Sequence, residues 1–312
     1  MSGSAWDALV DDAYGDWGSV DLGDLDSDHD VYVLAGALVA VRTGDAALLD
    51  EVVDALDTVR TSGFSRVLEL SRNLQSYVFA ADLIDLATVA PDVDAEFRTF
   101  LEQVRHEPLE GHSGGDDLES TAALSANNWG NHARAAMAAI TLYLGDEPGA
   151  AEVADWHLGW IGDRATYTGF GSWEDSGWHC DFDAPVGINP VGCTLDGHDA
   201  DGLLPEDERR SGDFTWPAPK EGYTWEALQG AVVAGVVLDR AGLVPLSAED
   251  DAILRAVEWH YRPNFDGGDT FPAEGDDTWQ IWVIDAVYAT DLPTEPSESG
   301  KNMGYTDWTH AP

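Results

Sequence analysis

Apolar residues recur at helical spacing along most of the chain, and almost nowhere at the alternating spacing of strands. In the stretch 65–89, for example, Leu74, Val78 and Ala81 fall on one side of a helix. Gly, Pro and Asp residues stand where these stretches begin and end. The sequence therefore predicts a mainly α-helical fold. The predicted helices cover residues 30–42, 45–61, 65–89, 91–106, 118–144, 149–164, 223–240, 247–261 and 277–290.

Short turns join most of these helices, so successive helices should pair as antiparallel hairpins. No sequence repeat typical of a helical solenoid stands out, which favours an incomplete α/α toroid over residues 28–292. Residues 1–27 form an N-terminal extension and residues 293–312 a C-terminal tail. Residues 167–221 lose periodicity and are rich in Gly, Pro, Trp and Asp. Because so long a loop region is usually functional, we expect it to line a central cleft.

The chain is strongly acidic, with 59 Asp and Glu against 15 Lys and Arg and a formal net charge of −44. Since 44% of its residues are hydrophobic and 13 are Trp, it can fill a large core, which excludes disorder for most of the chain. The acidic residues are spread along the whole sequence, a pattern that indicates adaptation to high salt. So few cations argue against nucleic acid as a partner. No segment reaches the roughly 20 apolar residues of a membrane span.

The first residues contain neither the basic nor the apolar region of a secretory signal. We therefore expect a cytoplasmic or virion-associated protein from a high-salt organism or its virus. Cys180 and Cys193 are the only cysteines, and they lie near His179 and His198. These four side chains have the ligand types of a zinc site, but their spacing fits no zinc motif, so free thiols or one disulfide are favoured. The sequence assigns no metal and no cofactor.

A polar segment interrupts an apolar, alanine-rich helical stretch at Asn127, Asn128, Trp129 and His132. Adjacent Asn residues weaken a helix, and buried amides need hydrogen-bond partners. One interpretation is that Asn127 and Asn128 cap a kink or the start of a helix. The other is that they serve a site, in which case Asn128 and His132, four residues apart, share a helix face.

Two of the scarce arginines, Arg209 and Arg210, stand side by side after a Gly-containing turn. They either bind an anion or neutralise the acidic residues that precede them. Tyr223 follows in the first turn of a predicted helix, where the helix dipole favours an anion. A Tyr in that position can equally serve packing alone.

The order of these residues resembles the alginate-lyase type of polysaccharide lyase. In that family an Asn-Asn-His segment precedes an Asp-Gly turn, an Arg and a Tyr that begins the next helix. The matching positions are Asn127-Asn128, Asp201-Gly202, Arg209 or Arg210, and Tyr223. Trp129 stands at the family's His position, and His132 is the candidate for a displaced imidazole. A subgroup with an Asn-Asn-Trp-Gly-x-His segment is more similar still, through 187–190, 274–279 and 301–308.

The resemblance implies β-elimination at a uronic acid, without a cofactor. Asn128 and Arg210 would stabilise the dianion that forms when the proton beside the carboxylate is removed. His132 would be the base and Tyr223 the acid, or Tyr223 would do both. The expected partner is an acidic polysaccharide or cell-surface glycan, and a homo-oligomer or larger assembly stays open. The residues expected to bind substrate are Asn127, Trp129, Arg72, Asn73, His198, Arg209 and Trp279.

Two other functions stay open on the sequence. Trp129 in place of the family's His favours a glycan-binding or structural module without turnover, for example a tail or receptor-binding component of a halophilic archaeal virus. A glycoside hydrolase would instead need two carboxylates across the cleft, and the chain is rich in Asp and Glu.

Overall fold

The computed structural model describes residues 3–171, 173–296 and 300–311, and in them the protein is mainly helical. This confirms the prediction of a mainly α-helical fold. Among these residues the strands are β1 (Thr194–Leu195) and β2 (His198–Asp199), which form one antiparallel hairpin. The helices are α1 (Gly3–Ala13), α2 (His29–Thr43), α3 (Ala46–Val59), α4 (Val67–Leu83), α5 (Leu86–Val89), α6 (Pro91–Val104), α7 (Leu118–Leu124), α8 (Asn128–Leu144), α9 (Glu147–Ile161), α10 (Pro205–Glu208), α11 (Gly222–Arg240), α12 (Ala248–His260), α13 (Trp279–Tyr288) and α14 (Thr306–Thr309).

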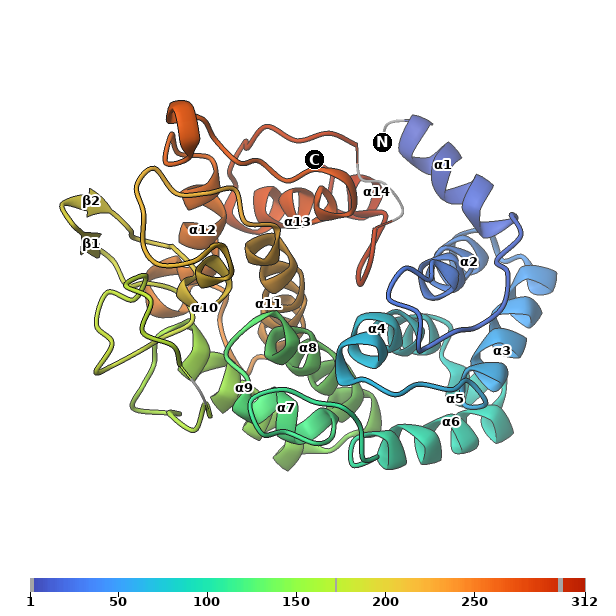
Figure 1. Ribbon diagram of the computed structural model, residues 1–312. Coiled ribbons are helices and arrows are strands. Elements are labelled where there is room, and N and C mark those ends of the chain that lie inside the picture. The colour runs from blue at the N-terminus through green and yellow to red at the C-terminus, as the bar shows by residue number, and fades with distance from the viewer. Residues whose placement is uncertain (1–2, 172, 297–299, 312) are drawn as a thin grey trace.

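The helices follow one another around an arc (Figure 1). Along it, α2 packs against α4, α4 against α8, and α8 against α11. Other helices lie outside this row: α3 packs against α2, α9 against α8, and α12 against both α9 and α11. The row α2, α4, α8 and α11 is called the inner row below.

Helix α8 of the inner row is contacted by α4, α7, α9 and α11. Its residues from Asn128 to Thr141 are buried on every side. Gly230 of α11 allows this close approach, because a Cβ at that position would lie 2.4 Å from the backbone carbon of Asn131. The start of α8 is thus fixed tightly against α11.

The predicted helix 118–144 is wrong in one respect, because residues 125–127 divide it into α7 and α8. Asn127 is the N-cap of α8, and its side-chain oxygen accepts the Trp129 N–H at 3.1 Å. This satisfies one of the N–H groups that a helix start leaves free. The interpretation that these asparagines mark a helix start is therefore confirmed.

Both ends of the chain join the same helical body. Helix α1, within the predicted N-terminal extension, packs against α2 and α14, and Leu9 belongs to the main core. From the predicted C-terminal tail, Lys301 and Asn302 are buried. The Trp6 and Trp308 rings lie 5.2 Å apart, so the two ends meet.

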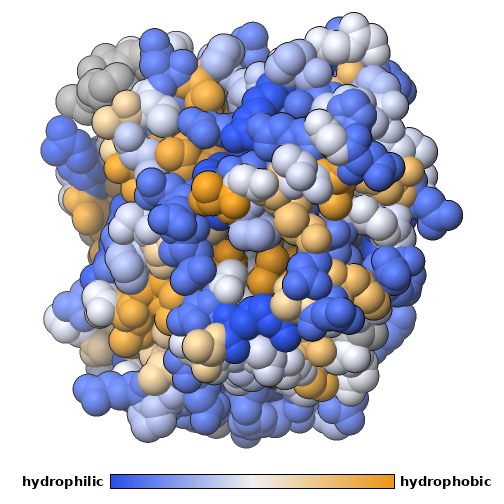
Figure 2. Space-filling view, turned by 90° about the vertical axis from the view of Figure 1, so that its left-hand side faces the viewer, coloured by the Kyte–Doolittle hydropathy of each residue, from blue (hydrophilic) through white to orange (hydrophobic). Residues whose placement is uncertain are grey.

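The predicted loop region 167–221 is largely irregular where it is described, apart from the β-hairpin, α10 and one 3₁₀ turn. Cys180 and Cys193 form a disulfide with Cα atoms 5.7 Å apart, which decides between the two favoured alternatives. Trp178 and Leu203 fill a small core of this region. Seen from the side that carries β1, β2 and α12, the surface is mostly hydrophilic with scattered apolar patches (Figure 2). Within the described chain, no helix has the length and apolar character of a membrane span.

Candidate functional site

Polar side chains gather where α8 and α11 of the inner row begin. The Arg210 guanidinium lies 3.5 Å from the Asn128 side-chain oxygen, and its carbon stands 4.1 Å from the centre of the Tyr223 ring. Arg210 is exposed, and Tyr223 is 38% exposed. The structure thus brings three of the four predicted catalytic residues together, with a guanidinium and a phenol open to solvent beside a buried amide.

The Asn128 amide is held from two further sides. Its nitrogen donates to the Glu226 carboxylate at 3.0 Å, while its backbone N–H donates to Asp207 at 2.9 Å. Asp207 lies on the short helix α10, so the loop region 167–221 contributes directly to the site. Burial, with the nearby charges of Glu206 and Glu226 adding to it, raises the pKa of Asp207 to about 8. At neutral pH this carboxyl is therefore mostly protonated and adds little negative charge.

His132 does not face this site. Its side chain is 0% exposed inside α8, and burial together with the Arg72 charge lowers its pKa well below the usual value, against the opposing contacts with Asn302 and the Glu226 backbone. A neutral imidazole suits a base, but one with no exposed surface cannot reach a sugar. The predicted displacement of the family's imidazole to His132 is therefore not supported by the geometry.

A different imidazole, His112, lies at the site. It comes from the polar segment before α7, and its ring packs against Trp129 with centroids 5.6 Å apart. Its Nε2 is 3.4 Å from the Asn127 side-chain nitrogen, and its Nδ1 is 3.2 Å from the Ser125 hydroxyl. Burial, followed by the charges of Arg210 and Arg209, lowers the pKa of His112. The imidazole contacts Asn127 and the Arg210 guanidinium contacts Asn128, so both groups lie at the start of α8.

Nothing in the local sequence pattern of His112 links it to Asn127, and the sequence does not single it out as a site residue. The only available signal was its place in a Gly-rich segment directly before the helix that leads into the Asn pair. The sequence does not single out Glu226 either. It stands three residues after Tyr223, a spacing that any two neighbours on one helix face share.

The two adjacent arginines have different roles. Arg209 binds Glu206 at 2.7 Å and Glu174 at 2.9 Å. Although burial opposes it, hydrogen bonds from His179 and Arg209 lower the pKa of Glu206. Arg209 thus neutralises its acidic neighbours, as one interpretation of the sequence held, and Arg210 is left to face Asn128 and Tyr223.

The other residues predicted to bind substrate are spread over the molecule. Trp129 is 9% exposed and lies between His112 and the Arg66 guanidinium. Trp279 is 0% exposed in the core, so the expectation that it stacks on a sugar is wrong. His198, in strand β2, stacks on Trp216 with ring centroids 4.5 Å apart, and none of the described contacts of its ring involves Asn128, Arg210 or Tyr223.

A second polar group lies between α2, α4 and the C-terminal residues. Lys301 donates to Asp30 at 3.0 Å and to the Asn73 side-chain oxygen at 2.6 Å. Asn73 also donates to the Asp24 carbonyl at 2.9 Å, so its side chain is fully engaged. Arg72, the residue before Asn73, lies at a small cavity with Asp276 and Lys301.

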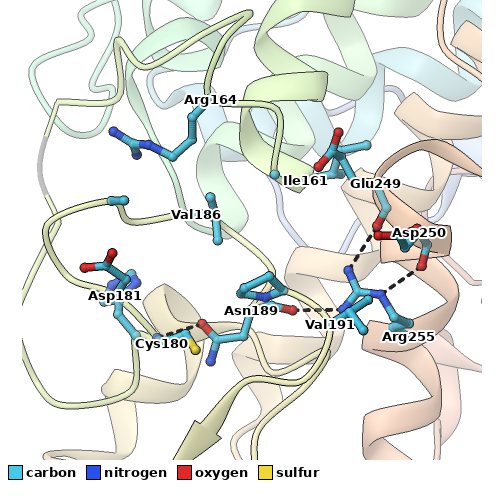
Figure 3. Close-up of a pocket in the computed structure, with 14 residues that line it drawn as sticks. Ile161, Arg164, Cys180, Asp181, Val186, Asn189, Val191, Glu249, Asp250 and Arg255 are labelled. Carbon is cyan, nitrogen blue, oxygen red and sulfur yellow. Dashed lines mark hydrogen bonds between the residues drawn. The ribbon is translucent and has the colours of Figure 1, made fainter.

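A separate cavity of about 290 Å³ lies beside the disulfide, between the end of α9 and the start of α12 (Figure 3). Arg255 at its wall donates to the Asn189 carbonyl at 2.9 Å and to the Asp201 carboxylate at 2.5 Å. Arg164 donates to the Pro185 carbonyl. Because both arginines already have protein acceptors, this cavity is not the candidate site.

In the described part of the chain, no group of three or more His, Cys, Asp or Glu side chains is arranged to hold a metal ion. Comparisons of the sequence with models of known protein families and with curated proteins found no match. The assignment of function therefore depends on the geometry around Asn128, Arg210 and Tyr223.

Proposed function

We propose that the protein is a polysaccharide lyase-like enzyme that cleaves a uronic-acid-containing glycan by β-elimination at the exposed surface of Arg210 and Tyr223. The observation that carries the proposal is the position of the Arg210 guanidinium, between the Asn128 amide and the Tyr223 ring. We also propose that the arc of helices is an incomplete α/α toroid, with the inner row as its inner wall. Both proposals agree with the resemblance of the sequence to the alginate-lyase type.

The chemistry assigns one task to each group. Arg210 binds the uronate carboxylate and, with Asn128 behind it, stabilises the dianion that develops as the C5 proton leaves. His112, kept neutral by its lowered pKa, accepts that proton. The electron pair forms the C4–C5 double bond, the bond from C4 to the glycosidic oxygen breaks, and Tyr223 gives its hydroxyl proton to the departing oxygen. The proton on His112 then returns to Tyr223 through solvent.

The test follows absorbance near the ultraviolet band of a 4,5-unsaturated uronate, with a panel of acidic polysaccharides in multimolar potassium chloride. We expect Tyr223→Phe and His112→Gln each to lower kcat by about 10²-fold or more, because each removes a proton-transfer group. His106→Gln is the matched control, since His106 begins the same segment and its side chain is 57% exposed. It should keep activity within about twofold.

Three results would contradict this assignment. A normal rate in Tyr223→Phe would exclude the proposed acid. A normal rate in His112→Gln, with an acid limb of the pH profile unchanged, would exclude the proposed base. New reducing ends without ultraviolet absorbance would indicate hydrolysis by two carboxylates instead of elimination.

A second candidate is a glycan-binding module without turnover, as a component of a larger assembly such as a virus particle from a high-salt environment. The observation that favours it is the Glu226 carboxylate, which already accepts the Asn128 amide at 3.0 Å and so occupies a donor that a substrate carboxylate would use. Folded protein that retains the glycan in a pull-down at high salt, yet gives neither absorbance nor reducing ends, would establish this alternative.

A further inference from the structure

The buried lysine of the C-terminal segment contacts two chemically different groups at once. The Lys301 Nζ donates to the Asp30 carboxylate at 3.0 Å and to the Asn73 side-chain oxygen at 2.6 Å. Asp30 lies on α2, Asn73 on α4, and Lys301 between α13 and α14. All three residues are buried. An amine, an amide and a carboxyl group thus meet in a place that solvent hardly reaches.

An ion pair alone does not need the amide. Lys220, the only other lysine of the chain, shows the ordinary arrangement, since it is 44% exposed and lies 3.6 Å from the Asp269 carboxylate. At Lys301 the amine also contacts an amide oxygen, and the electrophilic carbon of that amide lies one bond further on. A nucleophile and an electrophile that the fold holds together react as if each were present at very high concentration.

The Asn73 amide is fixed with its oxygen toward the lysine. Its nitrogen donates to the backbone carbonyls of Asp24 at 2.9 Å and Glu69 at 3.0 Å. A flipped amide would place its NH₂ group against the ammonium and its oxygen against these two carbonyls, so all of these contacts would be lost. The side-chain carbonyl of Asn73 therefore stays in front of the amine.

Asp30 is placed to move the proton that a reaction between these groups requires. A lysine nitrogen attacks only after it has lost a proton. Transfer of that proton from the ammonium to the Asp30 carboxylate leaves two uncharged groups, which burial favours. Burial raises the pKa of Asp30, although the Lys301 charge opposes the rise. Because Asp30 and Asn73 contact the same nitrogen atom, the carboxyl also lies beside the amide.

We propose that Lys301 and Asn73 form an isopeptide bond, with Asp30 as the proton carrier. The Lys301 Nζ attacks the Asn73 Cγ, a new C–N bond forms, and the bond from Cγ to the Asn73 nitrogen breaks. Of the two protons that the lysine nitrogen loses, Asp30 passes one to the departing nitrogen, and the other leaves with the ammonia as ammonium. The reaction needs no oxidant or reductant.

The ion pair is the state before the bond forms, and the bond would join α4 to the C-terminal segment across 228 positions of the chain. A cavity of about 230 Å³, which Lys301 helps to line, gives the ammonia a way out. The proposal is independent of the proposed glycan cleavage, because it involves none of the residues assigned to that reaction.

The test is mass spectrometry of the intact chain, kept folded in multimolar potassium chloride and then digested with trypsin after denaturation. We expect a mass lower than that of the sequence by one ammonia molecule. Trypsin should not cut after Lys301, because it needs a free basic side chain, and one peptide should join the stretch that begins at Asn73 to the stretch that contains Lys301. Cleavage after Lys220 is the internal control. A wild-type mass equal to that of the sequence, with normal cleavage after Lys301, would overturn the proposal.

Three variants assign the roles. Lys301→Arg keeps the positive charge but supplies no amine nucleophile, so it should retain the full mass, whereas Lys220→Arg should lose ammonia as the wild type does. If Lys301→Arg also loses ammonia, the loss occurs at another amide and the proposal is wrong. Asp30→Asn should slow bond formation by about 10²-fold or more, measured as the growth of the cross-linked fraction after cell-free synthesis. An unchanged rate in Asp30→Asn would reject Asp30 as the proton carrier.

Discussion

At the scale of single residues, the buried Asp207 carboxyl links the loop region to the start of α8. Its pKa is raised from 3.8 to about 8, chiefly by burial. A carboxyl with a higher pKa in the folded state stabilises the protein fully below the unfolded pKa, and this contribution is lost as the pH rises through the folded pKa. The free energy of unfolding should therefore fall between about pH 4 and about pH 8.

We expect Asp207→Asn to make that fall shallower. Asparagine keeps an oxygen for the Asn128 N–H but cannot ionise, and each pKa unit is worth about 1.4 kcal/mol. The difference between wild type and variant, measured by urea unfolding at constant salt across this pH range, should be at least about 1.4 kcal/mol. Asp213→Asn, at a nearby exposed aspartate, is the control. Parallel curves for wild type and Asp207→Asn would contradict the assignment.

The same scale shows what sequence could reveal of the site. The order of Asn128, Arg210 and Tyr223 in the sequence was enough to single out residues that the fold brings together. The sequence pointed to His132 on α8 as the imidazole. It could not show that His132 is enclosed, because α8 is buried on all sides and no apolar stripe distinguishes one face from another. Proximity of His112 to Asn127 depends on how the segment before α7 folds back, and spacing carries no information on that.

At the scale of elements, helices were predictable wherever one face is apolar and a cap residue marks the end. Asp45, for example, caps α3 by accepting two backbone N–H groups. The break between α7 and α8 was predictable only in part. The Asn pair indicated a kink or a helix start, but the contacts that stabilise the interruption, such as the Arg134 guanidinium donating to the Ser125 carbonyl at 2.9 Å, are tertiary and leave no local pattern.

The C-terminal segment was read as a tail because it is polar, yet Lys301 inserts between α2 and α4. Asp30 is 0% exposed, and its charge would be left buried and unpaired in Lys301→Met. We expect that variant to lose about 3–5 kcal/mol of stability in urea unfolding. Adding Asp30→Asn should restore a large part of the loss, because both buried charges are then removed.

The chain provides a close control, since Lys220 is its only other lysine. Lys220 is 44% exposed and lies 3.6 Å from Asp269, so Lys220→Met should change stability by at most about 1 kcal/mol. Equal losses of stability in Lys301→Met and Lys220→Met would show that the buried position of Lys301 adds nothing to its contribution. A further loss on adding Asp30→Asn would show that Asp30 is not the group that Lys301 neutralises.

At the scale of the whole molecule, the dominant quantity is the net charge of −44. Most of its carboxylates repel one another in dilute buffer, where the Debye length is about 10 Å at 0.1 M salt, and are screened at 1 M, where it is about 3 Å. Folding and the approach of an acidic glycan should both become more favourable as potassium chloride is added. The two effects have different origins, so a single salt titration of activity does not separate them.

A comparison of two substrates does separate them. The acidic glycan and its carboxyl-reduced, neutral form are compared over a range of potassium chloride concentrations in which circular dichroism shows a constant folded fraction. Because a like-signed field lowers encounter rates, kcat/KM for the acidic glycan should rise about tenfold until screening is complete, while binding of the neutral form stays flat. If the two respond alike, the charge acts on stability alone, and approach of a polyanion is not limited by the field of the protein. If only the acidic glycan responds, the surface charge of the protein sets the salt dependence of recognition separately from any effect on folding.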